Sequence, residues 1–135
     1  MISAQVVLTA QFGDLDPMQV VWHGNYVRYL EQGRAALMDK IDYNFPGLDA
    51  SGYLWPIVDM RLKYIRPIRF RQNVRVEATL VEYENRIRID YVCRDDASGE
   101  ILTKAHTIQV AVLAATGELS LESPPALLEK VRAAL

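Results

Sequence analysis

The spacing of apolar residues changes once along this chain, and that change limits the folds open to it. Between residues 25 and 41, apolar side chains and one glycine recur every three or four positions, which predicts an amphipathic helix. Between residues 58 and 113, apolar and polar residues mostly alternate, which predicts half-buried strands. One helix followed by several strands indicates an α+β domain whose helix packs on one face of an antiparallel sheet.

The helical stripe is formed by Tyr26, Leu30, Gly33, Leu37 and Ile41. Gly33 is its exceptional member, because glycine inside a helix costs about 1 kcal/mol relative to alanine. A close approach between the helix backbone and the sheet would explain a glycine at this position. Asn25 is predicted to cap the first turn of the helix.

Strands are predicted at residues 6–12, 58–64, 74–80, 87–93 and 101–113, which gives about five in total. The segment 44–55 contains Pro46, Gly47 and Gly52 and is predicted to be an irregular connection. A short C-terminal helix is predicted over 126–134, after two prolines. Its apolar side would consist of Leu127, Leu128, Val131 and Leu135.

Composition indicates one domain, residues 1–135, and excludes several classes of protein. With 15 Lys+Arg against 17 Asp+Glu, the chain lacks the basic excess of a nucleic-acid-binding protein. It has no apolar run of about 18 residues and no leader pattern, so we expect no membrane segment. The single cysteine, Cys93, agrees with a cytoplasmic location. Neither a metal-ligand spacing nor a phosphate-binding glycine loop is present, so we expect no metal site and no cofactor.

The segment 12–26 concentrates two carboxylates, a histidine and the predicted helix start. A loop carboxylate such as Asp16 can act as base or nucleophile, and free N–H groups at a helix start can stabilise an oxyanion. Acyl transfer needs those two parts. Taken alone, however, an aspartate before a proline is more often a turn residue or a cap.

The order Phe-Gly-Asp-x-Asp-Pro, Val-Trp and Asn-Tyr, followed by the amphipathic helix, resembles the signature of the 4-hydroxybenzoyl-CoA thioesterase branch of hotdog proteins. The resemblance implies a hotdog fold: an antiparallel sheet wrapped around one long helix, with a short C-terminal helix. It also implies acyl-CoA thioesterase activity, with Asp16 as the catalytic carboxylate and the His23 backbone N–H polarising the thioester carbonyl. Asn25 and Tyr26 belong to the same motif and are candidate substrate-binding residues.

The chain departs from the family pattern after the Asp-Pro pair, where the family usually has a small residue and a glycine. Here these residues are Met18 and Gln19. The Gln19 amide is a candidate for orienting a water molecule or narrowing the acyl pocket, and an inert loop residue is the alternative. Asp14 is predicted to be structural, accepting hydrogen bonds within the turn. Glu31, about two turns into the helix, would either hold the catalytic loop or face solvent.

Six basic residues and no acidic ones lie between positions 61 and 75. The simplest interpretation is a solvated sheet edge, where positive charge discourages aggregation. Beside a thioesterase motif, Arg69 and Arg71 become candidates for binding coenzyme A phosphates. His106 lies in a strand pattern and is predicted to be structural.

Several alternatives remain open from the sequence. Asp16 could attack directly or activate water, and the substrate could be an acyl-CoA or an acyl-carrier-protein thioester. The acyl group is undetermined, because the candidate pocket residues suit either an aromatic or an aliphatic group. A hydratase or dehydratase of hydroxyacyl thioesters and a non-catalytic acyl-CoA-binding protein are the competing functions. The exposed sheet edges and the family resemblance predict a homodimer or homotetramer. The candidate pocket residues are Met18, Gln19, Tyr53, Trp55 and Met60.

Overall fold

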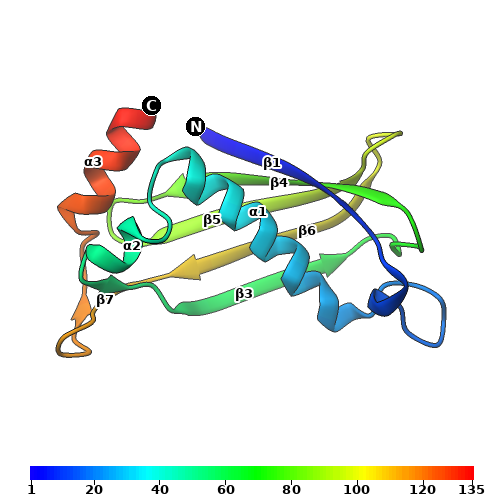
Figure 1. Ribbon diagram of the computed structural model, residues 1–135, viewed down its shortest axis with the longest axis horizontal. Helices are drawn as coiled ribbons and strands as arrows, with labels where there is room; N and C mark the ends of the chain where they lie inside the picture. The colour runs from blue at the N-terminus through cyan, green and yellow to red at the C-terminus, as the bar shows by residue number, and fades with distance from the viewer.

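A five-stranded antiparallel sheet curves around one long helix in the computed structural model, which describes residues 1–135 (Figure 1). The strand order is β1-β4-β5-β6-β3. This architecture confirms the α+β hotdog fold. Its elements are β1 (Ile2–Thr9), α1 (Tyr26–Lys40), β3 (Ile57–Tyr64), β4 (Asn73–Glu82), β5 (Ile87–Asp95), β6 (Ile101–Gln109) and α3 (Pro125–Ala134).

The core lies between α1 and the inner face of the sheet. Val74, Val76 and Ala78 of β4 are fully buried there, and the alternate residues of β5 lie beside them. Cys93 is one of these buried residues, and burial raises the pKa of its thiol to about 12. The thiol is therefore uncharged at neutral pH and unreactive.

Helix α1 approaches β4 so closely that only glycine fits at position 33. A Cβ atom on Gly33 would lie 2.6 Å from Val76 Cγ1, and Val76 is completely buried. The other stripe residues, Tyr26, Leu30 and Leu37, are buried as well. The predicted reason for Gly33 is therefore confirmed.

Replacing Gly33 by alanine is expected to lower the free energy of unfolding by about 1–3 kcal/mol, because the added methyl group overpacks the helix against Val76. This loss should appear although alanine is the better helix former. Chemical denaturation measures it, with Gly47→Ala as the control, since a Cβ there meets no atom within 4 Å. Val76→Ala in the Gly33→Ala background should recover part of the loss. A Gly33→Ala protein as stable as wild type would contradict the packing argument.

The first strand differs from its predicted bounds. It runs over Ile2–Thr9 instead of 6–12, and pairs with β4 from Ile2 opposite Leu80 to Thr9 opposite Asn73. The sequence pattern missed the start of this strand because polar residues occur there, and these lie on the outer face of the sheet. The strand ends opposite Asn73, the first residue of β4, and the chain then enters a 3₁₀ turn, η1 (Phe12–Asp14).

A second small sheet was not predicted. The segment expected to be irregular contains a one-turn helix, α2 (Gly47–Ala50), and a strand, β2 (Tyr53–Leu54). The last predicted strand breaks after Gln109, which pairs with the first residue of each neighbour in the main sheet, Ile57 of β3 and Ile87 of β5. The chain continues as β7 (Ala111–Leu113), which lies between β2 and β8 (Leu119–Ser120).

Some apolar residues are more exposed than the patterns predicted. Val58 lies at a bulge in the pairing of β3 with β6 and is 59% exposed, on the outer strand of the sheet. Leu135 follows the last turn of α3 and is 71% exposed, whereas Leu127 and Val131 are buried. None of the helices combines the length and the apolar character needed to cross a membrane.

Candidate active site

Asp16 lies in a tight, well-bonded loop between η1 and the helix start. Its backbone N–H donates to the Val20 carbonyl (2.9 Å), and its own carbonyl accepts from the Gln19 N–H (2.9 Å). The carboxylate oxygen Oδ1 accepts a hydrogen bond from the Met18 N–H at 2.8 Å. The other oxygen, Oδ2, accepts no hydrogen bond from the chain and is available to a reactant.

The backbone of Gln19 adopts the left-handed conformation, with φ of 65°. Such a φ is easiest for glycine, the residue expected at this position from the family pattern described above. Gln19 therefore occupies a backbone conformation that most side chains disfavour. Gln19 and Met18 are both exposed on this loop.

The Asp16 loop is attached to the connection between β3 and β4. The Val21 N–H donates to the Ile68 carbonyl (2.8 Å), and Val20 forms an isolated bridge with Arg69. At the tips of the two segments, the rings of Phe12 and Phe70 pack edge to face at 6.2 Å between centroids. The candidate catalytic carboxylate and the candidate phosphate-binding arginines therefore lie on adjoining loops.

Asp14 holds this region together through its side chain. Its Oδ2 accepts hydrogen bonds from the Tyr29 hydroxyl (2.8 Å) and the Gln11 N–H (2.9 Å), and its Oδ1 accepts one from Arg28 (2.5 Å). Burial alone would raise the pKa of Asp14, but the bonds from Gln11, Tyr29 and Arg28 outweigh it and lower the pKa. Asp14 is therefore a buried, charged anchor, as predicted.

The backbone of Asp14 ties the helix start to the Asp16 loop. Its carbonyl accepts from the Trp22 N–H (2.9 Å) and from the Asn25 side-chain amide (2.8 Å). Asn25 therefore does not cap the helix through its side chain, which corrects the prediction. The amide is used instead to fix the chain two residues before Asp16.

The helical run begins earlier than predicted, with a 3₁₀ turn, η2 (His23–Asn25), that continues into α1. Trp22 precedes it in an extended conformation. The N–H groups of His23 and Gly24 come first, so no carbonyl of the run itself can accept them. The Trp22 ring covers Gly24 so closely that a Cβ there would lie 2.4 Å from the ring.

The two side chains after this start have different environments. The His23 ring is exposed and stacks at a tilt on Trp22, 5.1 Å between centroids. Tyr26 is only 4% exposed and packs edge to face on Tyr64 at 4.8 Å. Burial raises the pKa of Tyr26, so its hydroxyl is neutral at physiological pH. The Tyr64 hydroxyl donates to the His23 carbonyl at 3.1 Å, which attaches the helix start to the end of β3.

The six basic residues between 61 and 75 divide into paired and unpaired ones. Arg66 forms an ion pair with Glu100, and Arg75 forms one with Asp96 at 3.2 Å. Arg69 and Arg71 are exposed and form no ion pair. The Arg71 guanidinium lies over the Phe70 ring, 5.0 Å from its centroid.

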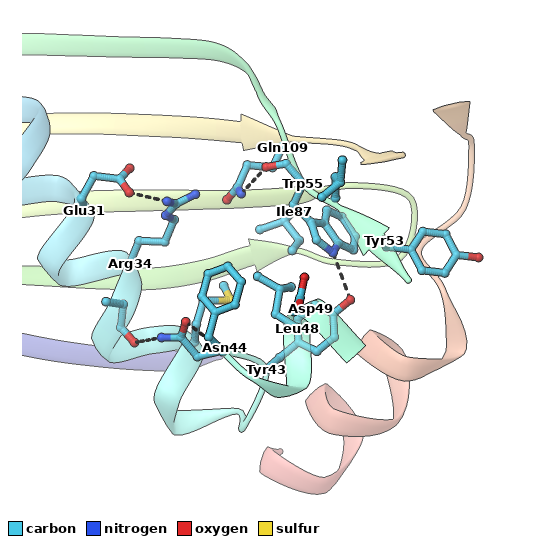
Figure 2. A pocket seen from close by; sticks show the side chains of 14 residues that line it. Glu31, Arg34, Tyr43, Asn44, Leu48, Asp49, Tyr53, Trp55, Ile87 and Gln109 are labelled. Atoms are coloured by element: carbon cyan, nitrogen blue, oxygen red, sulfur yellow. Dashed lines mark hydrogen bonds and ion pairs between the residues drawn. The ribbon is translucent and has the colours of Figure 1, made fainter. Parts of the chain in front are cut away.

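A cavity of about 290 Å³ lies toward the other end of the molecule, between the second half of α1, the α2 region and the ends of β5 and β6 (Figure 2). Glu31 lines it and forms an ion pair with Arg34. Its lining residues are Glu31, Arg34, Ala35, Met38, Tyr43, Asn44, Phe45, Leu48, Asp49, Tyr53, Leu54, Trp55, Ile87 and Gln109.

Sequence reasoning found only part of this cavity. Tyr53 and Trp55 line it as predicted, whereas Met18, Gln19 and Met60 do not. The Trp55 indole N–H donates to the Tyr43 hydroxyl at 3.0 Å, which fixes one wall. Arg34 and Gln109 were not identified: Arg34 is signalled only by its i, i+3 spacing from Glu31, and Gln109 looks like any polar residue of a strand.

Most candidate residues lie together in the structure, but the cavity lies at a distance from them. Asp16, His23 and the Arg69 loop gather at the end of β3 marked by Tyr64. The cavity lies at the opposite end, beside Trp55 and the start of β3. An eight-residue strand separates these ends by roughly 23 Å.

Comparison with known proteins places the chain in a family. The thioesterase-like superfamily matches residues 10–135. A Bacillus subtilis protein named provisionally as the acyl-CoA thioesterase YneP is 24% identical over 105 residues, which cover 78% of this chain and 76% of that protein.

Solved structures share the fold. DHNA-CoA thioesterase from Staphylococcus aureus superposes with a TM-score of 0.81 at 23% identity, covering 88% of this chain and 80% of that one. An aspartate-to-asparagine mutant of 4-hydroxybenzoyl-CoA thioesterase, complexed with 4-hydroxybenzoyl-CoA, gives 0.79 at 20% identity, covering 96% and 99%. The chain is a thioester hydrolase and belongs to the thioesterase-like superfamily.

Proposed function

We propose that this protein is an acyl-CoA thioesterase in which Asp16 drives hydrolysis at the start of the long helix. The observation that carries the proposal is the free Oδ2 of Asp16, on a loop tied to the helix start through the Asp14 carbonyl. A fixed carboxylate, on a loop tied to a helix start that has unpartnered N–H groups, supplies the two parts that acyl transfer requires. The superfamily match and the acyl-CoA thioesterases among the relatives support the same activity.

In this mechanism the thioester carbonyl oxygen accepts hydrogen bonds from the leading N–H groups, at His23 and Gly24. Asp16 either takes a proton from water, which attacks the carbonyl carbon, or attacks that carbon itself to form a mixed anhydride that water then cleaves. In both routes the C–S bond breaks, the sulfur leaves as the thiol of coenzyme A, and the acyl group is released as the acid. The His23 side chain is not required, because the backbone supplies the donor.

Assays of thiol release, double-bond formation and binding on the wild-type protein test the proposal. Free thiol is measured after addition of short, long and aromatic acyl-CoAs and of acyl-carrier-protein thioesters, and we expect release from at least one acyl-CoA class. Formation of a double bond without thiol would indicate a dehydratase. Tight acyl-CoA binding without turnover would indicate a binding protein. Faster thiol release from the carrier-protein thioester than from acyl-CoA would indicate that the acyl carrier is the carrier protein and not coenzyme A.

Arg69 and Arg71 are proposed to bind coenzyme A phosphates. Both are exposed, free of ion pairs and on the loop bridged to the Asp16 segment. A guanidinium group binds phosphate through two parallel hydrogen bonds. Both arginines are exposed next to the ring pair of Phe12 and Phe70, where the polar coenzyme A part of the substrate can lie.

Replacing Arg69 and Arg71 together by glutamine is expected to raise KM for acyl-CoA by about tenfold while leaving KM for a truncated acyl-pantetheine thioester nearly unchanged. Steady-state thiol release on the two substrates measures the difference. The exposed Arg132→Gln serves as the control for losing an arginine elsewhere on the surface. Equal KM increases on both substrates would exclude phosphate recognition by these arginines.

We also propose that the working enzyme is a dimer joined along β3. This strand is one edge of the sheet, and the exposed apolar residues Leu54, Val58 and Tyr64 lie on it or at its start. Antiparallel pairing of two copies about a two-fold axis brings the Ile57 end of one strand beside the Tyr64 end of the other. The cavity of one subunit would then adjoin the partner's Asp16, which joins the two halves of the site.

Light scattering on a gel-filtration column should give twice the chain mass of 15.3 kDa. Val58→Lys is expected to shift the protein toward monomer and to reduce thiol release, because charge on an edge strand opposes pairing. Val7→Lys is the matched control, since Val7 is 49% exposed on the opposite edge strand, β1. A monomeric wild-type enzyme with full activity would refute the shared site.

A further inference from the structure

Two hydrogen bonds meet at the carbonyl oxygen of His23, at the start of the helical run. The Tyr64 hydroxyl donates to it at 3.1 Å, and the Tyr26 N–H donates to it as the closing bond of η2. In Figure 1 the end of β3, where Tyr64 lies, is beside the start of α1. The Tyr26 bond belongs to the helical run itself. The Tyr64 bond is therefore the one that only the tertiary structure supplies.

The His23 carbonyl shares one peptide unit with the N–H of Gly24. Because the unit is planar and trans, its carbonyl and its N–H point in opposite directions. Holding the carbonyl toward Tyr64 therefore fixes the direction in which the Gly24 N–H points. Gly24 is exposed, and its N–H has no acceptor within the chain, so a substrate oxygen can reach it.

A hydrogen bond to a peptide carbonyl also makes the N–H of the same unit a stronger donor. Each bond in such a chain strengthens the next by about 10–30%. The preceding N–H, that of His23, has similar support, because the Trp22 carbonyl of its peptide unit accepts from the Asn25 N–H at 2.8 Å. Both leading N–H groups are thus polarised through their own peptide units, and for Gly24 a side chain contributes.

The simplest alternative is that Tyr64 only attaches the helix start to β3. Its ring already makes that attachment, since it packs edge to face on Tyr26 at 4.8 Å between centroids. Tyr64 is 49% exposed, so water can satisfy its hydroxyl without the His23 carbonyl. The hydroxyl bond is therefore an addition to the packing, and its effect falls on the peptide that it contacts.

We propose that Tyr64 is a positioning residue for thioester hydrolysis. Its hydroxyl orients and polarises the His23–Gly24 peptide, so that the Gly24 N–H serves as a second donor to the thioester oxygen beside the His23 N–H. The proposal rests on the proposed thioesterase function, which supplies that oxygen. Negative charge grows on the oxygen as the carbonyl carbon becomes tetrahedral, so a stronger donor favours the transition state over the bound substrate.

Tyr64→Phe tests the hydroxyl, because the ring that packs on Tyr26 is kept. We expect kcat for thiol release to fall by about 2- to 10-fold with KM nearly unchanged, a smaller loss than the roughly 10²- to 10³-fold for removing a direct oxyanion donor. Site-specific 3-fluorotyrosine at this position, a stronger hydroxyl donor, should at least match wild type. Tyr83→Phe, just beyond β4, is the control, because its hydroxyl forms no hydrogen bond within the chain.

The stretching frequency of the bound thioester carbonyl reports donor strength, and a purely mechanical role would not change it. Benzoyl-CoA and hexanoyl-CoA labelled with ¹³C at the carbonyl are the probes, bound to Asp16→Asn so that turnover is slow. Difference infrared spectra should show a frequency below that of the free thioester. Adding Tyr64→Phe should move it part of the way back. Equal frequencies in the two proteins, or equal kcat in wild type and Tyr64→Phe, would overturn the proposal.

The same measurements separate this proposal from the proposed function. If wild type releases thiol and Tyr64→Phe changes neither kcat nor the carbonyl frequency, the Tyr64 proposal fails alone. If no substrate releases thiol but Tyr64→Phe still changes the frequency of a bound acyl-CoA, the thioesterase proposal fails and the polarised Gly24 donor stands. Light scattering on Tyr64→Phe should give the wild-type mass. A changed mass would assign the lower kcat to altered assembly and would also overturn the proposal.

Discussion

Asp16→Asn is expected to lower kcat for thioester hydrolysis by about 10²- to 10⁴-fold, the range that positioned acid–base groups contribute. Asparagine keeps the oxygen that accepts from the Met18 N–H, so the turn should persist. What it loses is the negative charge and basicity of the free Oδ2. Asp16→Ala should be equally inactive and should also loosen the loop. Thiol release under saturating acyl-CoA measures both variants.

The control for this prediction is Asp42→Asn. Asp42 is exposed beyond the end of α1, and its backbone φ of 56° is one that asparagine accepts readily. The chemical change is the same, and activity should stay near that of wild type. If Asp16→Asn retained activity within about threefold of wild type, Asp16 would be a turn residue only. The free Oδ2 would then have no role in the chemistry.

Asp14→Ala is expected to lower the free energy of unfolding by about 2–4 kcal/mol, because the substitution leaves the buried Tyr29 hydroxyl and the Gln11 N–H without an acceptor. The Arg28 partner is mostly exposed and adds little. Chemical denaturation of the variant measures the loss. Tyr29→Phe should lower the free energy of unfolding by less than Asp14→Ala does. In the double variant the loss should be smaller than the sum of the two single losses. Additive losses would mean that the Asp14–Tyr29 bond contributes nothing of its own.

The pKa of Asp14 predicts how this stabilisation depends on pH. Since the folded pKa lies below the ordinary value of about 4, the unfolded chain binds more protons between the two values. The contribution is therefore fully present above about pH 4 and is lost as pH falls through the folded pKa. The stability difference between wild type and Asp14→Asn should narrow over that interval. A difference that stays constant from pH 7 to pH 3 would show that the Asp14 charge does not stabilise the fold.

Local sequence patterns alone predicted the helix and the strands that each pack one face against the core. The stripe from Tyr26 to Leu37 predicted α1, and the alternation around Val76 and Ile89 predicted the central strands, because each period places one face toward a common core. Gly33 was explained in advance because its cost in a helix demands a compensating contact. The Phe12 to Tyr26 motif located the candidate catalytic loop, since turn chemistry and a helix start are local properties.

Tertiary structure alone decided how those parts are used. Asn25 lies inside the helical run, and its side-chain N–H donates to the Asp14 carbonyl, which only the fold brings within reach. β6 ends at Gln109, opposite the first residues of β3 and β5, and at this edge of the sheet Gln109 becomes a buried amide that lines the cavity. A local sequence pattern does not show which neighbouring strands end at the same level of a sheet. It also does not show that the cavity lies at the opposite end of β3 from Asp16.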